Sequence, residues 1–218
     1  MSTDVAVLVS GGLDSAILVA ELLRPGRVVH PIYVRFGLAW ESVEEAHLQR
    51  FLATLERPAL EPLTVLSAPI TSVYGAHWSV SGDAVPDERT EDDAVYLPGR
   101  NLVLLAQPSV WCALHGVPAI ALGTLKGNPF LDSSRDFLDD FAALVKKGLG
   151  HSLDVLTPFA ELTKAEVIER GRDLAVQHTF SCIAPRDGRH CGHCNKCAER
   201  RLAFSAAKIE DVSEYAER

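Results

Sequence analysis

A short loop near the amino terminus holds residue types that could bind a phosphate. Ser10-Gly11-Gly12-Leu13-Asp14-Ser15 follows an apolar run, Val5–Val9, that is typical of a strand buried on both faces of a sheet. The two glycines let the backbone approach an anion closely. The helix expected next would offer free N–H groups and a partial positive charge. The two serines add hydroxyl donors, and Asp14 would orient the loop or help to hold Mg²⁺, so the segment predicts a phosphate-binding loop.

Two common phosphate loops are excluded by the residues present. The chain has no Gly-Lys-Ser or Gly-Lys-Thr, so the loop is not of the Walker A type, and it lacks the G-x-G-x-x-G pattern of dinucleotide sites. An ordinary glycine-rich turn, capped by serine or aspartate, is the alternative. The position after the first strand favours a ligand site, because open α/β sheets bind ligands at the carboxyl ends of their strands.

The second segment whose residues could carry a chemical function is a cysteine cluster near the carboxyl terminus. Cys182, Cys191, Cys194 and Cys197 are spaced C-x₈-C-x₂-C-x₂-C, and Gly192 gives the backbone freedom to wrap around an ion. Four thiolates around a redox-inert tetrahedral ion describe a closed structural zinc site. Disulfides and an iron–sulfur cluster are the alternatives. The ferredoxin pattern needs a further cysteine and then a proline, which this chain lacks at that spacing.

The other residues of this kind have simpler interpretations. His190 and His193 lie between the expected ligands, and with four thiolates present we expect both to be exposed. Cys112 lies in an apolar helical segment beside Trp111 and Leu114, so we expect it to pack in the core rather than to react.

The overall composition restricts the class of protein. The 47% apolar content is enough for one domain with a core over residues 1–218. The net charge of −8 argues against a polynucleotide as the main partner, although Arg200 and Arg201 could form a local basic patch. No apolar run approaches the ~20 residues that span a bilayer, and Met1 to Asp4 lacks the features of a secretory signal. We expect a cytoplasmic protein outside the membrane.

Alternating strand and helix patterns must position the two segments. Apolar runs predict strands over Val5–Val9, Val28–Val34, Leu63–Leu66 and Ala119–Leu122. A polar stretch, Ser81–Asp93, is expected to be a mobile surface loop. The predicted helices cover Ala16–Leu23, Ser42 to about Leu55, a stretch after Asn101, Asp136–Lys147, Thr163 to about Gly171, and Ala198–Ala207.

This alternation predicts an α/β fold with a doubly wound, Rossmann-like parallel sheet. A C-terminal zinc-binding helical element is expected over residues 178–205. Two capping boxes, Ser42 with Glu45 and Thr163 with Glu166, mark expected helix starts.

The phosphate loop also resembles that of a known superfamily. Ser10–Ser15 matches the S-G-G-x-D-S loop of the PP-loop ATP pyrophosphatases. The resemblance implies a sheet of the adenine-nucleotide alpha-hydrolase type and cleavage of ATP to AMP and pyrophosphate. Such enzymes adenylate a carbonyl or carboxylate oxygen, so that a nitrogen or sulfur nucleophile can displace AMP. The loop would stabilise charge on the departing pyrophosphate, with Mg²⁺ as counter-charge.

Further segments narrow the resemblance and extend it over nearly the whole chain. They are Leu97–Asn101, Thr157-Pro158, Thr163–Glu166, Phe180–Cys182, His190–Cys197, Arg200 and Phe204. Together they are similar to the 7-cyano-7-deazaguanine synthases of queuosine biosynthesis. The resemblance implies that the acid of 7-carboxy-7-deazaguanine is adenylated and displaced by ammonia to give an amide. The amide oxygen is then adenylated and lost to leave a nitrile.

The resemblance assigns roles to matching residues. The residues implied in ATP binding are Ser10, Gly11, Gly12, Leu13, Asp14, Ser15, Arg100 and Asn101. Those implied in catalysis are Asp14, Ser15, Arg100, Lys164 and Asp132. The implied zinc ligands are Cys182, Cys191, Cys194 and Cys197. Alternatively, Arg100 and Asn101 only cap the following helix, and Lys164 is solvated. Glu41 and Asp132 are candidates for the base that deprotonates ammonia.

The resemblance also implies the partners of the chain. They are a small-molecule carboxylate and ammonia, with no polynucleotide and no membrane, and the chain is expected to form a homodimer. Ammonia would be free or brought by a partner, because the chain is too short to include an amide-hydrolysing domain.

The chain departs from the family pattern where the acid would bind. Gly37-Leu38-Ala39-Trp40 replaces a G-Q-R-H pattern, and Thr124–Asn128 replaces another family loop. Phe130–Phe137 replaces Y-P-D-C-R-P-E-F, with Asp132 kept. A zinc-containing PP-loop ligase for another carboxylate is therefore an alternative. A tRNA-thiolating enzyme and a non-catalytic nucleotide-binding module are two more.

Overall fold

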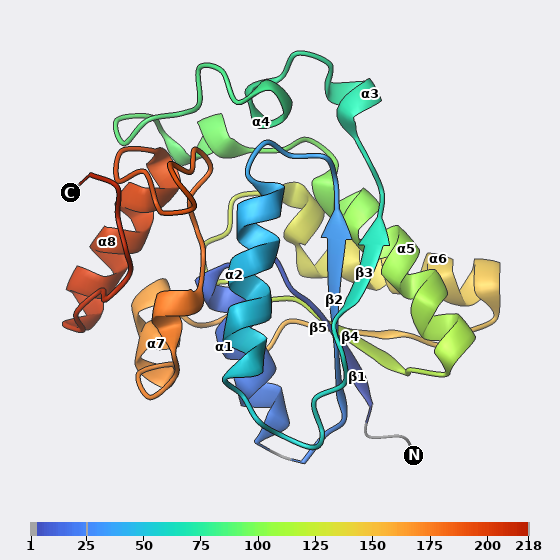
Figure 1. The fold of residues 1–218 in the computed structure, drawn as a ribbon. Helices are drawn as coiled ribbons and strands as arrows, with labels where there is room; N and C mark the ends of the chain where they lie inside the picture. The colour runs from blue at the N-terminus through green and yellow to red at the C-terminus, as the bar shows by residue number, and fades with distance from the viewer. Residues whose placement is uncertain (1–3, 25, 218) are drawn as a thin grey trace.

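Five parallel strands form the sheet in the part of the chain that the structure describes. The structure is a computed structural model that describes residues 4–24 and 26–217. The strands are β1 (Val5–Leu8), β2 (Val29–Arg35), β3 (Thr64–Ser67), β4 (Ala119–Ala121) and β5 (Asp154–Leu156). Their order is β3-β2-β1-β4-β5, and Figure 1 shows β2 and β3 side by side. The chain reverses its direction of winding at β1, so the carboxyl end of β1 opens onto the crevice where such folds bind ligands.

Helices cover both faces of this sheet. The longer ones are α1 (Leu13–Leu23), α2 (Glu41–Ala53), α5 (Arg100–His115), α6 (Arg135–Leu149) and α8 (Asn195–Ala207). The shorter ones are α3 (Thr71–Tyr74), α4 (Trp78–Ser81), α7 (Lys164–Arg170) and the 3₁₀ turns η1 (Asp92–Val95), η2 (Leu131–Ser133) and η3 (Val176–His178). In Figure 1, α1 and α2 lie on one face and α5 and α6 on the other.

The residues of β1 explain the two layers, because successive side chains of a strand point to opposite faces. Val5 and Val7 pack in a cluster with α1 residues such as Ile17. Ala6 and Leu8 pack in a second cluster with residues of α5 and α6. Both sides of β1 are therefore buried, as its continuous apolar run predicts.

The predicted α/β fold is confirmed, with shifts at several ends and one strand that was missed. The strand β5 is only three residues long and begins with Asp154, so it has no apolar run that a sequence pattern could detect. Helix α8 begins at Asn195 instead of Ala198. Cys112 is fully buried in α5, as expected.

Only one of the two predicted capping boxes forms. The Thr163 hydroxyl accepts a hydrogen bond from the Glu166 N–H, and the Glu166 carboxylate accepts one from the Thr163 N–H. The Ser42 box was wrong, because α2 begins one residue earlier and Ser42 already lies inside the helix. The Glu45 carboxylate binds Arg35 instead, with two contacts of 2.7 Å.

Most of Ser81–Asp93 is an irregular, exposed segment, as the predicted surface loop requires, but its main chain has fixed partners. Backbone groups of this segment bind the cysteine region: the Glu88 N–H donates to the His193 carbonyl (2.9 Å), and the Pro86 carbonyl accepts from the Asn195 N–H (3.0 Å). The polar composition reflects exposed side chains, while the main chain is held in place by a distant part of the sequence.

Two remaining expectations concern membranes and secretion. None of the helices in the described residues has the length and apolar character needed to cross a bilayer. Residues 1–3, most of the stretch that was considered for a secretory signal, lie outside the described residues.

Candidate active site and metal centre

The predicted phosphate loop connects β1 to α1, at the carboxyl edge of the sheet. Gly11 has a positive φ of 72°, which is the left-handed region that favours glycine. The Ser15 hydroxyl donates to the Gly12 carbonyl (3.1 Å) and accepts from the Ser10 N–H (3.2 Å). Gly12 caps α1 without a side chain. The first-turn amides of α1 therefore face the loop with no side-chain cap and are available to an anion.

We expect Gly11→Ala to damage this loop more than its backbone angle alone would explain. A Cβ atom at Gly11 would lie 2.8 Å from the Glu44 carbonyl oxygen, so the loop or α2 must move. Gly116→Ala is the matched control: its φ is 68°, and nothing lies within 4 Å of the added atom. The control should lose about 1–2 kcal/mol of stability from strain.

Urea unfolding and calorimetric titration with ATP would test this comparison. Gly11→Ala should be the less stable variant and should bind ATP about tenfold or more weakly, which corresponds to about 1.4 kcal/mol. Equal ATP affinity in the two variants would show that the close approach of Gly11 to α2 does not shape the ligand site.

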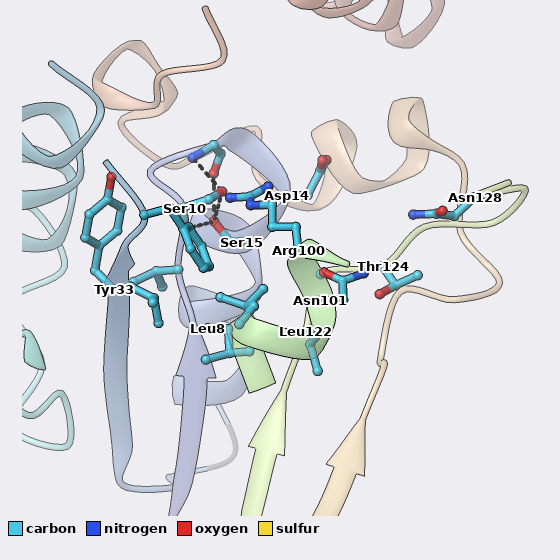
Figure 2. Close-up of a pocket in the computed structure, with 16 residues that line it drawn as sticks. Leu8, Ser10, Asp14, Ser15, Tyr33, Arg100, Asn101, Leu122, Thr124 and Asn128 are labelled. Carbon is cyan, nitrogen blue, oxygen red and sulfur yellow. Dashed lines mark hydrogen bonds between the residues drawn. The ribbon is translucent and has the colours of Figure 1, made fainter. Parts of the chain in front are cut away.

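Two adjoining cavities open beside the loop. The smaller, of 190 Å³, lies between the loop and the start of α5 (Figure 2). The larger, of 540 Å³, extends from the loop toward the cysteine region. Both are lined by the same central residues: Ser10, Gly12, Asp14, Arg100, Gly123 and Asn128.

Arg100 points into this shared region from the first position of α5. Its guanidinium carbon lies 5.4 Å from the ring centroid of Phe36. Figure 2 shows the side chain extending toward Ser10 and Asp14. Its Nε is buried and has no hydrogen-bond partner among the residues that the structure describes. A planar guanidinium with an unused donor is well suited to bind a phosphate or carboxylate.

Asn101 lines the smaller cavity, and Asp132 supports it from behind. The Asp132 carboxylate accepts hydrogen bonds from the Asn101 N–H (3.2 Å) and the Asn101 side-chain amide (3.3 Å). Asp132 is buried and is not among the described residues that line either cavity. It fixes the helix end that carries Arg100, while its expected catalytic role stays a prediction.

Lys164 reaches the loop from the first position of α7. Its ammonium lies 3.3 Å from Asp14 and 2.5 Å from Glu199, and Lys196 lies 2.6 Å from the other Glu199 oxygen. Burial works against the charge of Lys164, but the two carboxylates outweigh it and raise its pKa above the usual value. Lys164 is therefore a charged ammonium that two carboxylates hold beside the predicted phosphate loop, and not a solvated side chain.

The four cysteines meet as the spacing predicted. All four are buried, and their sulfur atoms lie within 4.8 Å of one another. The sulfurs of Cys182 and Cys194 are 3.8 Å apart, and those of Cys191 and Cys197 are 3.9 Å apart. Zinc–sulfur bonds of about 2.3 Å in a tetrahedron place neighbouring sulfurs about 3.8 Å apart. The donor set therefore fits zinc.

The residues between the cysteines differ in exposure. His193 is half-exposed, as expected, and lies 2.8 Å from Glu217. His190 was expected to be exposed but is buried, with 1% of its surface accessible. The reason lies in the carboxyl-terminal segment, which folds back along it: the Ala216 N–H donates to the His190 carbonyl (2.7 Å).

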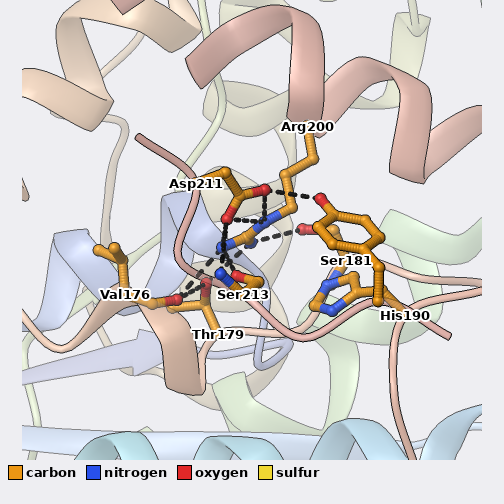
Figure 3. A network of polar contacts seen from close by, with 8 residues as sticks. Val176, Thr179, Ser181, His190, Arg200, Asp211 and Ser213 are labelled. Atoms are coloured by element: carbon orange, nitrogen blue, oxygen red, sulfur yellow. Dashed lines mark hydrogen bonds and ion pairs between the residues drawn. The ribbon is translucent and has the colours of Figure 1, made fainter. Parts of the chain in front are cut away.

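A buried arginine organises the same region, and Arg200 and Arg201 do not form the basic patch that their sequence positions suggested. Arg200 is fully buried. Figure 3 shows its guanidinium donating to the Thr179 hydroxyl (2.9 Å) and the Ser213 hydroxyl (2.7 Å) and pairing with Asp211 (3.2 Å). Arg201 pairs with Glu88 instead (3.1 Å). Arg200 thus joins α8 to the segment that leads into the first cysteine.

That segment in turn contacts the phosphate loop. The Phe180 N–H donates to the Gly11 carbonyl (2.7 Å). A second link runs from α8, where Glu199 holds Lys164 beside Asp14. The cysteine cluster and the predicted phosphate loop are therefore parts of one structure around the larger cavity.

Comparison with known proteins identifies the family. A family model described as "Queuosine biosynthesis protein QueC" matches residues 4–208. The chain belongs to the QueC family. The 7-cyano-7-deazaguanine synthases of Thiobacillus denitrificans and Methanothermobacter thermautotrophicus are 33% and 30% identical to it. Each alignment covers 96% of this chain, and 97% and 98% of the respective relative.

Solved structures resemble the chain in fold alone. An NMN synthetase from Francisella tularensis has a TM-score of 0.51 at 13% identity, covering 96% of this chain and 79% of that one. A 4-thiouridine synthetase, solved with RNA and bound ATP, has a TM-score of 0.53 at 14% identity, covering 94% of this chain and 50% of that one. These likenesses support the predicted α/β fold.

The segment that departs from the family pattern builds one wall of the larger cavity. Trp40 stacks on Trp78, with ring centroids 5.8 Å apart and planes inclined by 16°. Both rings line the cavity, as does Phe130 from the other altered segment. Trp40, which replaces the histidine of the G-Q-R-H pattern, therefore offers a flat apolar ring to the cavity.

One residue of the site was missed by sequence reasoning. Glu44, on α2, is buried and lines the larger cavity, and it accepts a hydrogen bond from the Tyr33 hydroxyl (2.8 Å). It is one of three glutamates within five residues, so its sequence context gave no signal. Glu41, the expected candidate, instead accepts hydrogen bonds from the backbone N–H groups of Phe36 and Gly37.

Proposed function

We propose that this QueC family member converts 7-carboxy-7-deazaguanine and ammonia into 7-cyano-7-deazaguanine, using ATP twice and releasing AMP and pyrophosphate. The observation that carries the proposal is the larger cavity, whose lining joins the phosphate loop to the first turn of α8 in the zinc element. Its 540 Å³ is within the range of small-molecule sites. Relatives that share almost the full length of the chain bear the name of this synthase.

The loop residues and their neighbours suit adenylation of a carboxylate. A carboxylate oxygen attacks the α-phosphorus of ATP, and the bond from that phosphorus to pyrophosphate breaks. Negative charge grows on the departing pyrophosphate. The amides of the loop, Lys164 and Arg100 are placed to stabilise that charge. Ser10 and Ser15 hold the loop in shape through their mutual contacts.

The proposal includes two metal ions, and this chain offers candidate ligands for each of them. Asp14 would help to hold Mg²⁺, because its Oδ1 is buried and has no partner among the described residues, and magnesium prefers carboxylate oxygens. The ion supplies counter-charge for the phosphates. Cys182, Cys191, Cys194 and Cys197 would hold zinc in a closed structural site.

We extend the proposal to the assembly and setting of the protein. A single domain of residues 1–218, a homodimer and a cytoplasmic location are proposed. The four free thiols that group at one candidate metal site support a reducing compartment, where disulfides rarely form. The net charge of −8 supports a small-molecule substrate over a polynucleotide.

Mass spectrometry of a complete reaction tests the function. Purified protein with ATP, magnesium, ammonium and 7-carboxy-7-deazaguanine should yield the nitrile and two AMP for each nitrile formed. Without ammonium, no amide or nitrile should appear. Absence of both AMP and nitrile in the complete mixture would reject this substrate.

A second candidate, favoured by the tryptophan wall, is a ligase of the same chemistry that acts on another flat aromatic acid. Trp40, from a segment where the family pattern is altered, stacks on Trp78, and both rings line the cavity. A panel of aromatic acids in the same assay separates the two: this candidate predicts AMP formation with a different acid and none with the deazaguanine acid.

A further inference from the structure

Glu44 lies where the phosphate loop and both cavities meet. A Cβ atom placed on Gly11 would be 3.0 Å from the Glu44 Cγ, so the glutamate side chain packs directly over the loop. Glu44 lines the larger cavity together with Ser10 and Arg100. Its hydrogen-bond partner Tyr33 lines the smaller one. A group that reacts beside the loop is therefore within reach of this carboxylate.

The surroundings of Glu44 hold it in place and tune its proton affinity. The pKa of Glu44 is raised to about 7, mainly by burial and further by Glu41. Arg100 on α5, the Tyr33 hydroxyl on β2 and the Trp40 side chain act in the opposite direction. Burial and the same carboxylate raise the pKa of Tyr33, which stays a neutral donor. A base that titrates near neutrality is suited to proton transfer at physiological pH.

We propose that Glu44 is the general base that takes protons from the reacting nitrogen in both halves of the reaction. This inference rests on the proposed function of the chain. It assigns a residue to the proton transfers, which the loop, the lysine and the metal centre do not perform.

In the first half, ammonia attacks the carbonyl carbon of the acyl adenylate. The new carbon–nitrogen bond leaves a positive charge on nitrogen and a negative charge on oxygen. Glu44 accepts one proton from that nitrogen. The carbon–oxygen double bond then re-forms, the bond to AMP breaks, and AMP leaves with the electron pair. The products are the amide, AMP and protonated Glu44, which returns its proton to water.

In the second half, the amide oxygen is adenylated, and the nitrogen must lose both of its protons. Loss of the first proton gives an imidate whose nitrogen has a lone pair. That pair forms the third carbon–nitrogen bond as the bond to AMP breaks, and the second proton then leaves the nitrilium nitrogen. The same nitrogen stands at the same carbon in both halves, so one base in one position serves all the transfers.

The other carboxylates near the loop have other contacts or roles. Asp14 pairs with Lys164 and is the proposed ligand of Mg²⁺. Glu41 accepts backbone hydrogen bonds from Phe36 and Gly37. Asp132 is bound to Asn101 and lines neither cavity among the described residues. Glu199 lies between two lysines. Glu44 combines burial, a cavity position and a neighbouring hydroxyl.

The variant Glu44→Gln tests the assignment, with Glu45→Gln as the matched control. Glutamine keeps an oxygen that can accept from Tyr33 but cannot take a proton, and Glu45 pairs with Arg35 on the outside of the same helix. In Glu44→Gln, the exchange of pyrophosphate into ATP that requires the carboxylic acid substrate should continue at close to the wild-type rate. Amide and nitrile formation should fall by about 10²-fold or more. Glu45→Gln should keep both activities.

The pH profile gives an independent readout. In the wild type, kcat/KM for nitrile formation should fall as the pH drops below about 7, because the protonated carboxyl cannot accept a proton. This fall at low pH, the acid limb of the profile, should be absent from the residual activity of Glu44→Gln. Glu44→Asp should restore both part of the rate and the acid limb.

Three results would overturn the assignment while leaving the proposed function intact. They are nitrile formation at the wild-type rate in Glu44→Gln, an equal loss of pyrophosphate exchange and nitrile formation, or an acid limb that survives the substitution. If the wild type itself makes neither AMP nor nitrile, the proposed function fails, and the assignment fails with it.

Discussion

Replacing Asp14 with asparagine should reduce acid-dependent pyrophosphate release by about 10²–10³-fold, the loss typical when one group that stabilises transition-state charge is removed. The Asp14 carboxylate lies 3.3 Å from the Lys164 ammonium, and its other oxygen is buried without a partner among the described residues. Asparagine has nearly the same shape but no charge. The variant therefore loses an ion pair that positions Lys164 and the ligand proposed for Mg²⁺.

The fold should survive this change. Asp14 lies in the first turn of α1, where a negative charge stabilises a helix by about 0.3–1 kcal/mol. Asp139→Asn is a suitable control, because Asp139 pairs with Arg135 on α6 and lines neither cavity among the described residues. Release of pyrophosphate at the wild-type rate in Asp14→Asn would remove this carboxylate from the mechanism. Thermal unfolding of both variants would show that the comparison concerns activity and not folding.

The position of the loop and the grouping of the four cysteines could be predicted because their chemistry is local. Ser10–Ser15 carries its own signal: an apolar strand, two glycines and hydroxyl residues in immediate succession. The cysteine spacing limits where four sulfurs can lie, and the structure brings them together within 4.8 Å. In both segments the residues that act together are close in sequence, so few other arrangements are open to them.

The rest of the site depends on contacts between distant segments. Glu44 and Glu45 have the same chemistry and adjacent positions, yet one is buried beside the loop and the other binds Arg35. Only the packing of α2 over the loop separates them. Arg200 and His190 similarly resemble surface residues in sequence, but both are buried in the structure. Their partners lie in distant parts of the chain, and a short sequence pattern does not predict such contacts.

Replacing Cys194 with serine should remove zinc and weaken ATP binding together. The serine hydroxyl is a poor zinc ligand at neutral pH, and the free energy of binding structural zinc, on the order of 10 kcal/mol in small zinc domains, is part of the folding free energy. A net loss of about 4 kcal/mol would lower the thermal midpoint by roughly 8–16 °C in a chain of this size. Metal analysis of the purified variant and its thermal unfolding measure these two effects.

ATP affinity should fall as well, because α8 begins directly after this ligand. Its first five residues include Lys196 and Glu199, which line the larger cavity, and Glu199 holds Lys164 beside the phosphate loop. Cys112→Ala is the matched control: it removes a buried thiol from α5, far from the cluster in sequence, and should keep one zinc per chain. A variant at Cys194 that retained one zinc per chain would show that the ligand set is wrong. One that lost zinc yet bound ATP normally would show that the metal supports the helix without shaping the nucleotide site.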